Sequence, residues 1–301
     1  MPFSTSFRPR DMAYLRRIRT AVELGSRRKM HALMEGIHHS PYHARSLQFD
    51  DLRPYIPGDD MADVDWRATA RSGEILVKQY VAERHQTVVI VVPTGADLCG
   101  AASVTETKAD VALMVAGLFA WLALRQGDRV CVVSSRHGSP MVARPSSREV
   151  AVERMLVHAH QQCSLDNPTA DLATLCRSAI RGVRSDGQAI VLLDDWEPDD
   201  DTTSALRLLA ERRPTMAVTV PDADPTADSA VWMDLGRGRR VPRAFLADSA
   251  LADELTEQRE RRARERDEVL HNLGIAHTEV ETTHDVVARL LTLVKQAQNA
   301  R

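Results

Sequence analysis

The residues of this sequence that are best suited to chemistry are carboxylates that follow two predicted strands. Asp97 comes shortly after the apolar run Thr87–Val92, and Asp194 and Asp195 come directly after a second apolar run. In an open α/β sheet, ligands bind in the crevice outside the carboxyl ends of the strands. Together with the acidic stretch that continues to Asp201, these side chains could bind a divalent cation and support a metal-dependent hydrolase.

The other parts of a catalytic centre are missing from the sequence. It contains no phosphate-binding GxxxxGK[ST] loop, no GxGxxG after the first strand, no HExxH and no GxSxG. No general base stands beside a nucleophile or beside a set of substrate-positioning groups. The motifs therefore favour a chain that is not an enzyme, with the metal-dependent hydrolase as the alternative.

The composition indicates a globular protein with a packed core. The chain has 301 residues, of which 44% are hydrophobic and 27% are charged, so it can form one large domain or two smaller ones. Its net charge is −3 and 4% of its residues are aromatic, which leaves few stacking platforms for nucleic acid. A basic N-terminal segment favours a nucleic-acid partner, but the overall balance predicts none.

No targeting segment or membrane span is apparent in the sequence. The most apolar run, Val111–Leu124, is shorter than the about 20 residues that a membrane span needs, so it predicts a buried core helix. The four cysteines show no metal-ligand spacing, which is typical of reduced thiols in a cytoplasmic protein. We therefore predict a cytoplasmic location.

Strand and helix patterns alternate from Gln86 to the C-terminus. The predicted strands are Thr87–Val92, Arg129–Ser134, Gln188–Leu193, Thr215–Val220 and a weaker one near His277–Val280. The predicted helices are Thr105–Arg125, Ser147–Gln161, Thr169–Val183, Asp201–Arg212, Ser249–Leu273 and Thr283–Ala297. This alternation predicts a doubly wound, mainly parallel α/β sheet with helices on both faces, over residues 85–301. The glycine-rich stretch Val231–Val241 predicts a small hairpin.

Residues 1–84 form a polar, basic and more irregular N-terminal region. One helix is predicted from about Arg10 to Met34. Its narrow apolar stripe, which could dock on the core, consists of Met12, Leu15, Ile18 and Val22. A loop-rich stretch follows and closes in a half-exposed strand within Glu74–Glu83.

The predicted helix Ser249–Leu273 is rich in charge. Glu257 and Arg261, and likewise Glu260 and Arg264, have the i,i+4 spacing of helical ion pairs. A run this polar is typical of a solvated helix face, and a partner-binding helix is the alternative.

The stretch Leu52–Glu83 combines charges of both signs with aromatic residues. Arginine forks pair with carboxylates and stack on aromatic rings. The residues concerned are Arg53, Arg71 and Lys78 with Asp59, Asp65 and Glu83, around Tyr55 and Trp66. Such a set could be a binding surface, or it could be a polar staple that fixes an irregular segment onto a sheet. The density of opposite charges favours the staple.

The same stretch closely resembles the signature of a bacterial family, the domain of unknown function 58. The family pattern reads roughly RxYxxGDxxxxIDWxxxARxxxLxVKxxxxE, and Val64, in place of isoleucine, departs from it conservatively. The matching residues are Arg53, Tyr55, Gly58, Asp59, Asp65, Trp66, Ala70, Arg71, Leu76, Val77, Lys78 and Glu83. The resemblance extends from about Gly36 to the C-terminus.

The resemblance implies that a domain similar to von Willebrand factor A follows the signature. It also implies a partner of the MoxR-type AAA+ ATPase class, because members of the family are often encoded beside such ATPases. The function that it implies is that of a protein-interaction module, an adaptor or co-chaperone, and not of an enzyme. Many members carry N-terminal membrane helices, which this sequence lacks, so it looks like a short, soluble version.

Domains similar to von Willebrand factor A often bind Mg²⁺ through Asp-x-Ser-x-Ser after the first strand, a loop threonine and a later aspartate. Mg²⁺ requires hard oxygen ligands in octahedral geometry. The aligned residues here are Pro93, Gly95, Asp97, Thr169 and Asp195, so the first loop lacks its lead carboxylate and one hydroxyl. The resemblance thus implies a degenerate metal site without a required cofactor, in which Asp97, Thr169 and Asp195 could form a displaced Mg²⁺ set.

These residues also have a simpler interpretation. Aspartate and threonine are common at strand ends and helix starts, where they form turns and cap helices. Thr169, just before a helical pattern, has the position of an N-cap. The sequence leaves both interpretations open.

Overall fold

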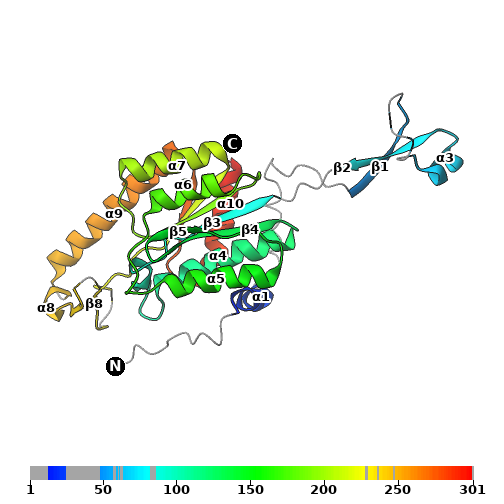
Figure 1. Cartoon of the computed structure of the whole chain (residues 1–301). Helices are drawn as coiled ribbons and strands as arrows, with labels where there is room; N and C mark the ends of the chain where they lie inside the picture. The colour runs from blue at the N-terminus through cyan, green and yellow to red at the C-terminus, as the bar shows by residue number, and fades with distance from the viewer. Residues whose placement is uncertain are drawn as a thin grey trace.

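The computed structural model describes residues 13–24, 48–56, 59, 61, 64–81, 86–227, 230–235, 237–246 and 248–299. Its centre is a six-stranded sheet in the order β10–β7–β6–β3–β4–β5 (Figure 1). The strands are β3 (Thr87–Val91), β4 (Arg129–Arg136), β5 (Ser139–Val142), β6 (Ala189–Leu193), β7 (Thr215–Thr219) and β10 (Ala276–Glu279). Neighbouring strands pair in parallel, except that β5 pairs antiparallel with β4 at one edge. The predicted mainly parallel α/β sheet is therefore confirmed.

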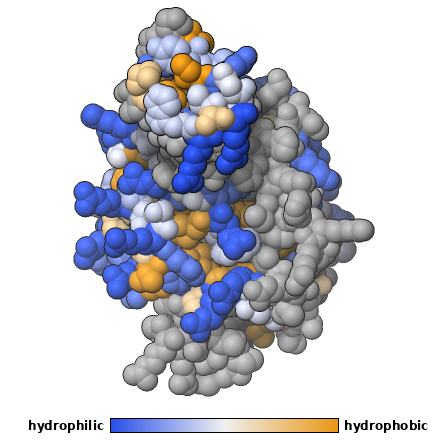
Figure 2. Space-filling view, turned by 90° about the vertical axis from the view of Figure 1, so that its right-hand side faces the viewer, coloured by the Kyte–Doolittle hydropathy of each residue, from blue (hydrophilic) through white to orange (hydrophobic). Residues whose placement is uncertain are grey.

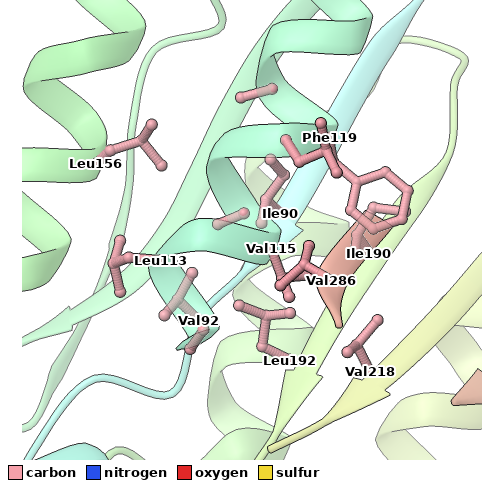
Figure 3. Packing of buried hydrophobic residues seen from close by; sticks show 14 of the residues in the cluster. Ile90, Val92, Leu113, Val115, Phe119, Leu156, Ile190, Leu192, Val218 and Val286 are labelled. Carbon is pink, nitrogen blue, oxygen red and sulfur yellow. The ribbon is translucent and has the colours of Figure 1, made fainter. Parts of the chain in front are cut away.

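The central strands are buried on both faces, as their continuous apolar sequences require. In β3 the side chains alternate between two cores: Val88 and Ile90 lie in one, and Val89 and Val91 lie in the other. Figure 3 shows the first core, in which Ile90 lies among residues of the neighbouring strands and of a long apolar helix. Because both faces of β3 are covered, a ligand could approach this strand only beyond its carboxyl end.

Helices cover both faces of the sheet (Figure 1). One face carries α1 (Tyr14–Leu24), α4 (Lys108–Arg125), α5 (Glu149–Gln162) and α10 (Val286–Asn299). The other carries α6 (Leu172–Gly182), α7 (Asp200–Arg212) and the C-terminal part of α9 (Ser249–Asn272). The apolar run Val111–Leu124 lies in α4 and is largely buried, as predicted. Within the described residues, no helix has the length and apolar character needed to cross a membrane.

The N-terminal helix α1 docks on α4 and α5, as its apolar stripe predicts. Leu15 and Ile18 are buried in the first core. A Cβ atom at Gly117 of α4 would lie 2.3 Å from Ile18 Cδ1, so the absence of a side chain there makes room for Ile18. Glu153 of α5 accepts hydrogen bonds from the backbone N–H groups of Tyr14 (2.6 Å) and Leu15 (2.9 Å), which satisfies the first turn of α1. Met12, the side chain of Val22 and residues 25–34 lie outside the described part.

The family-like stretch forms a small unit, which we call the signature unit (described residues within 48–81). It consists of β1 (Gln48–Pro54), α3 (Trp66–Ser72) and β2 (Leu76–Val81), and β1 pairs antiparallel with β2. The sequence predicted β2 but read the preceding residues as irregular. A helix forms there because the Asp65 carboxylate caps it, and because Gly73, at φ +78°, ends it. In Figure 1, α3 lies at the end of the unit away from the six-stranded sheet.

Between β7 and α9 lie a short hairpin of β8 (Met233–Asp234) and β9 (Arg239–Arg240), and the single-turn α8 (Arg243–Leu246). The hairpin agrees with the prediction from the glycine-rich stretch.

Candidate functional site

The carboxyl ends of β3 and β6 form the crevice where this type of sheet binds ligands. From β3 the chain builds β4 and β5 to one side and then crosses to β6 on the other side. The strand order thus reverses between β3 and β6, and such a reversal opens a crevice beyond the strand ends. The loops there begin at Pro93 and at Asp194.

Two residues at the end of β3 are buried in the fold, so they offer no free group for catalysis or for binding a metal. Pro93 is buried. Thr94 is also buried, and its Oγ1 donates to the Ser135 carbonyl (3.1 Å) and accepts from the Ser135 N–H (2.9 Å). This reciprocal pair ties the end of β3 to the end of β4. No motif or spacing in the sequence singles out Thr94.

Gly95 is fixed by a close approach between two loops. Its φ is +147°, and a Cβ atom built on it would lie 2.6 Å from the Pro168 carbonyl oxygen and 2.7 Å from Thr169 Cα. Both the conformation and the space exclude a side chain. The structure therefore brings Gly95 and Thr169 together, but through their backbones. A serine could not occupy position 95 unless the loop at Pro168 moved.

Asp97 and Thr169 are exposed at the rim of the crevice. Asp97 begins a 3₁₀ turn, η3 (Asp97–Cys99). The expectation that Thr169 caps the following helix is wrong: Asp171 is the N-cap of α6, and its carboxylate accepts from the Thr174 N–H at 3.0 Å. The helix starts later than predicted because the residues up to Ala170 are held against the β3 loop.

Asp194 and Asp195 follow the same strand but meet different neighbours. One oxygen of Asp195 pairs with Arg266 (3.2 Å) and the other with Arg262 (3.8 Å), both on α9. Burial raises the pKa of Asp194, Lys108 partly offsets this, and the charges of Asp97 and Asp222 raise it further. Asp194 therefore interacts electrostatically with Asp97 in the crevice, and the neighbouring charge of Asp195 also raises its pKa.

Lys108 supplies an internal cation to the crevice. It is the first residue of α4 and is 4% exposed, and its Nζ lies 2.7 Å from Asp222 Oδ1. Its stem passes over Gly100, where a Cβ atom would lie 2.9 Å from Lys108 Cε. A cation at a helix N-terminus opposes the helix dipole, so the carboxylates around it are what make the position tolerable. Sequence reasoning missed Lys108, although a lysine that opens an apolar helix is an available signal.

Three arginines of α9 form ion pairs with carboxylates that lie at the carboxyl ends of the strands. Arg259 pairs with Asp224 (3.5 Å), Arg262 with Glu197 (2.7 Å), and Arg266, besides Asp195, with Glu279. Their spacing puts them on one face of the helix. Of the three, Arg266 is buried, whereas Arg259 and Arg262 are partly exposed. The buried residues of α9 are Arg266 and Leu270, and the rest of the helix is half-buried or exposed, in agreement with the prediction of a largely solvated helix. On its exposed side, Arg264 pairs with Glu260 as predicted (3.3 Å), whereas Arg261 approaches Glu265 (4.0 Å).

The residues do not fit the displaced Mg²⁺ set. Asp195 is engaged by α9, and the crevice already contains the Lys108 ammonium group. Among the described residues, no group of three or more His, Cys, Asp or Glu is arranged to hold a metal ion. The arrangement can instead present a surface whose carboxylates are largely balanced by cations of the same chain.

Among the described charges of the signature unit, one pair of opposite sign forms, as the staple interpretation predicts. Arg53 forms a bidentate pair with Asp59 (2.6 and 2.7 Å), and Arg53 holds the pKa of that carboxyl below its usual range. Asp65 is used as the cap of α3. Tyr55 is half-buried and Arg71 is exposed. Gly58, Glu83 and the side chain of Lys78 lie outside the described residues.

The apolar residues of the signature unit are unusually exposed. Ile56 is 57% exposed, Met61 52%, Trp66 60% and Ile75 43%, and α3 buries none of its residues. Figure 2 views the molecule from the side of this unit and shows hydrophobic residues at the surface among hydrophilic ones. Large exposed apolar side chains grouped in one small unit are typical of an interaction surface.

The family model described as "Protein of unknown function DUF58" matches residues 51–229, which is more than half of the chain. The chain belongs to the DUF58 family. The match includes most of the signature unit and both loops of the crevice.

Other comparisons agree in naming no activity. The chain is 27% identical over 243 residues to uncharacterized proteins of Mycobacterium bovis and Mycobacterium tuberculosis, covering 77% of this chain and 74% of theirs. Two solved structures match at 10% identity: a conserved hypothetical protein BatB from Bacteroides thetaiotaomicron (TM-score 0.46; 71% of this chain, 98% of that one) and an aerotolerance-related membrane protein from Bacteroides fragilis (TM-score 0.42; 70% and 98%).

Proposed function

We propose that this DUF58 chain is a non-enzymatic interaction module that acts as an adaptor or co-chaperone with a MoxR-type AAA+ ATPase. The observation that carries the proposal is the exposed apolar surface of the signature unit, formed by Ile56, Met61, Trp66 and Ile75. Among the side chains of this two-stranded unit whose burial the structure describes, Val64 and Val77 are the buried ones. Such a small unit is marginal in water, so a partner that covers the exposed apolar surface would stabilise it.

We propose further that residues 85–301 form a domain similar to von Willebrand factor A with a degenerate metal site. Numbered along the chain from β3, the strand order is 3-2-1-4-5-6, which is that of a doubly wound sheet. A side chain at position 95 would clash with the Pro168 loop, and Asp195 and Lys108 are already engaged in ion pairs. These contacts support a carboxyl edge of the sheet that functions without a bound ion. The four free cysteines support a reducing, cytoplasmic setting.

The test is reconstitution with a MoxR-type AAA+ ATPase from the same organism. We expect the two proteins to associate and the rate of ATP hydrolysis to change on association. Trp66→Ala should weaken both effects, because exposed tryptophans are frequent hot spots of interfaces. Val150→Ala is the matched control, since Val150 is 65% exposed on α5. Absence of association, or equal association by both variants, would contradict the proposal.

One observation favours the alternative of a metal-dependent hydrolase: the raised pKa of Asp194, since perturbed carboxyls collect at active sites. Calorimetric titration with Mg²⁺, Mn²⁺ and Ca²⁺ separates the two. We expect no heat of binding from any of the three, and saturable binding with a hydrolytic activity would favour the enzyme.

A further inference from the structure

A second surface feature lies at the C-terminal ends of α6 and α7, at the end of the sheet opposite to the crevice. There the two helices form an open groove of about 780 Å³. Its lining residues are Ile180, Arg181, Arg184, Leu208, Glu211 and Arg212. Helix C-termini on this face lie at the amino ends of the strands, so the groove is separate from the crevice at the carboxyl ends. No part of the proposed function uses it.

The groove has an apolar component that the fold does not bury. Leu208 is 51% exposed although it stands on a helix whose other leucines, Leu206 and Leu209, are fully buried. Ile180 lies opposite on α6 and is half-buried. A volume of this size with an apolar lining suits the side chains along one face of a bound segment.

The rim of the groove is cationic. Arg181, Arg184 and Arg212 stand against the single carboxylate of Glu211 among the lining residues. Arg181 contacts a hydroxyl, Ser178 Oγ, at 3.4 Å, and within the described structure Arg184 and Arg212 form no ion pair. The dipoles of the two helix C-termini offset part of this charge, but they are worth about half an elementary charge each.

A buried arginine next to the groove adds to its positive charge. Arg213 is 5% exposed, and its Nη2 donates to the carbonyl of Val183, the residue before Arg184 (2.6 Å). Its Nε and Nη1 have no hydrogen-bond partner in the described part of the chain. A cationic group that is buried and only partly satisfied strengthens the attraction of this region for an anion.

We infer that the groove between the C-terminal ends of α6 and α7 binds an acidic segment of a partner protein. Aliphatic side chains of that segment pack against Leu208 and Ile180, and its carboxylates pair with Arg181, Arg184 and Arg212. Charge complementarity selects the carboxylates, and the exposed leucine selects a protein over a nucleic acid. The described lining contains no aromatic side chain on which bases could stack. The inference is independent of the ATPase and goes beyond the proposed function.

The probe is a fluorescein-labelled peptide of about 12 residues that carries leucines at i and i+4, with glutamates at the other positions, the spacing of a helix that lies in a groove. We expect saturable binding to the full chain in fluorescence anisotropy, weakening as salt is added. A peptide with glutamine in place of glutamate, and one with serine in place of leucine, should each bind much more weakly.

Charge-reversal variants localise the binding. Arg184→Glu together with Arg212→Glu should weaken binding at least about tenfold, which corresponds to 1.4 kcal/mol. Arg154→Glu, an exposed arginine on α5 across the sheet, is the matched control and should bind normally. Leu208→Ser should weaken binding, whereas Val150→Ser should not. All these positions are exposed, so the variants should fold, which circular dichroism verifies.

Several outcomes would overturn the inference. They are absence of saturable binding, equal binding by the double charge-reversal variant, and equal binding of the serine peptide. If an oligonucleotide of the same net charge displaced the peptide as effectively as unlabelled peptide does, the groove would recognise negative charge alone and not a protein segment. Because only this chain and a peptide are mixed, failure here leaves the ATPase proposal untouched.

Discussion

Lys108 Nζ lies 2.7 Å from Asp222 Oδ1, and this pair joins a side chain that is 4% exposed to one that is 51% exposed. The buried cation thus lies at the inner end of the crevice, and its carboxylate partner reaches the surface. Because Lys108 also lowers the pKa of Asp194, it is the charge that balances the crevice.

Replacing Lys108 should shift the titration of a residue that is not its ion-pair partner. Lys108→Met keeps the apolar stem and removes the charge, so the pKa of Asp194 should rise above its value in the native chain. NMR-detected titration of the Asp194 carboxyl carbon measures this. Lys295→Met, at an exposed position of α10, should leave Asp194 unchanged. An unchanged Asp194 in Lys108→Met would show that the ammonium does not act on the crevice.

Asp194 should make stability depend on pH. Its pKa is raised in the folded chain, so the folded state holds this proton more tightly than the unfolded state does. The resulting stabilisation is present below the ordinary aspartate pKa of about 3.9 and is lost as the pH rises through the raised value. Asp194→Asn stays neutral, and should therefore gain stability relative to the native chain as the pH rises through that window. Urea unfolding at several pH values measures the gain. Asp166→Asn, in an exposed loop, should show none.

Position 95 should not tolerate a side chain. Gly95→Ala meets the Pro168 carbonyl at 2.6 Å as well as an unfavourable φ, and should cost about 2–4 kcal/mol of unfolding free energy. Gly274 has a φ of +67° and open space around it, so Gly274→Ala measures the cost of a left-handed backbone without a steric clash, about 1 kcal/mol. Denaturant unfolding compares the two. Equal costs would mean that the loop at Pro168 yields freely.

The arginines of α9 should contribute very unequally. Arg266 is 1% exposed and paired with Asp195 and Glu279. Arg266→Ala removes a buried side chain, the arginine partner of Glu279 and one of the two arginine partners of Asp195, and should cost about 1–3 kcal/mol. Arg264 is 70% exposed beside Glu260, and Arg264→Ala should cost less than about 0.5 kcal/mol. Thermal unfolding distinguishes these values, and similar costs would contradict the role assigned to the buried face of α9.

The contact between Ile18 and Gly117 should show energetic coupling. Ile18→Val removes Cδ1 and should cost about 0.5–1.5 kcal/mol. Gly117→Ala places a methyl group 2.3 Å from that atom and should cost about 1–3 kcal/mol through overpacking. The double variant should be more stable than the sum of the two costs predicts, because the new methyl fills the space that the lost one leaves. Additive costs in a double-mutant cycle would show that α1 adjusts its position instead.

The sheet could be predicted from the sequence because its signal is strong and local. The apolar run at Thr87–Val91 is long enough for a strand and too short for a helix, and its neighbours alternate with helical patterns. The end of α6 nearest the crevice was harder to predict. Thr169 and Asp171 are both good caps, and only the contact of the Pro168 loop with Gly95 decides that Asp171 is used.

The choice between Asp194 and Asp195 could not be made from the sequence. Adjacent residues beyond a strand point in directions that depend on the loop and on the elements packed against it. Here Arg266 of α9, 71 residues further along the chain, engages Asp195 and leaves Asp194 to the crevice. The sequence pattern predicts an irregular signature unit for a related reason. Its residues bury little, so hydrophobic periodicity gave no indication of β1 or α3.

The contact of Gly95 with the Pro168 loop has an evolutionary consequence. A serine at position 95 would be destabilising in the present background, and it would become acceptable only after the loop had been rerouted. A rerouted loop would still face Lys108 and an Asp195 held by α9. A single substitution at position 95 is therefore not enough to turn this crevice into an ion-binding site. The loop contact, the buried ammonium and the ion pairs of α9 thus make the acquisition of a metal at this crevice depend on several changes at once.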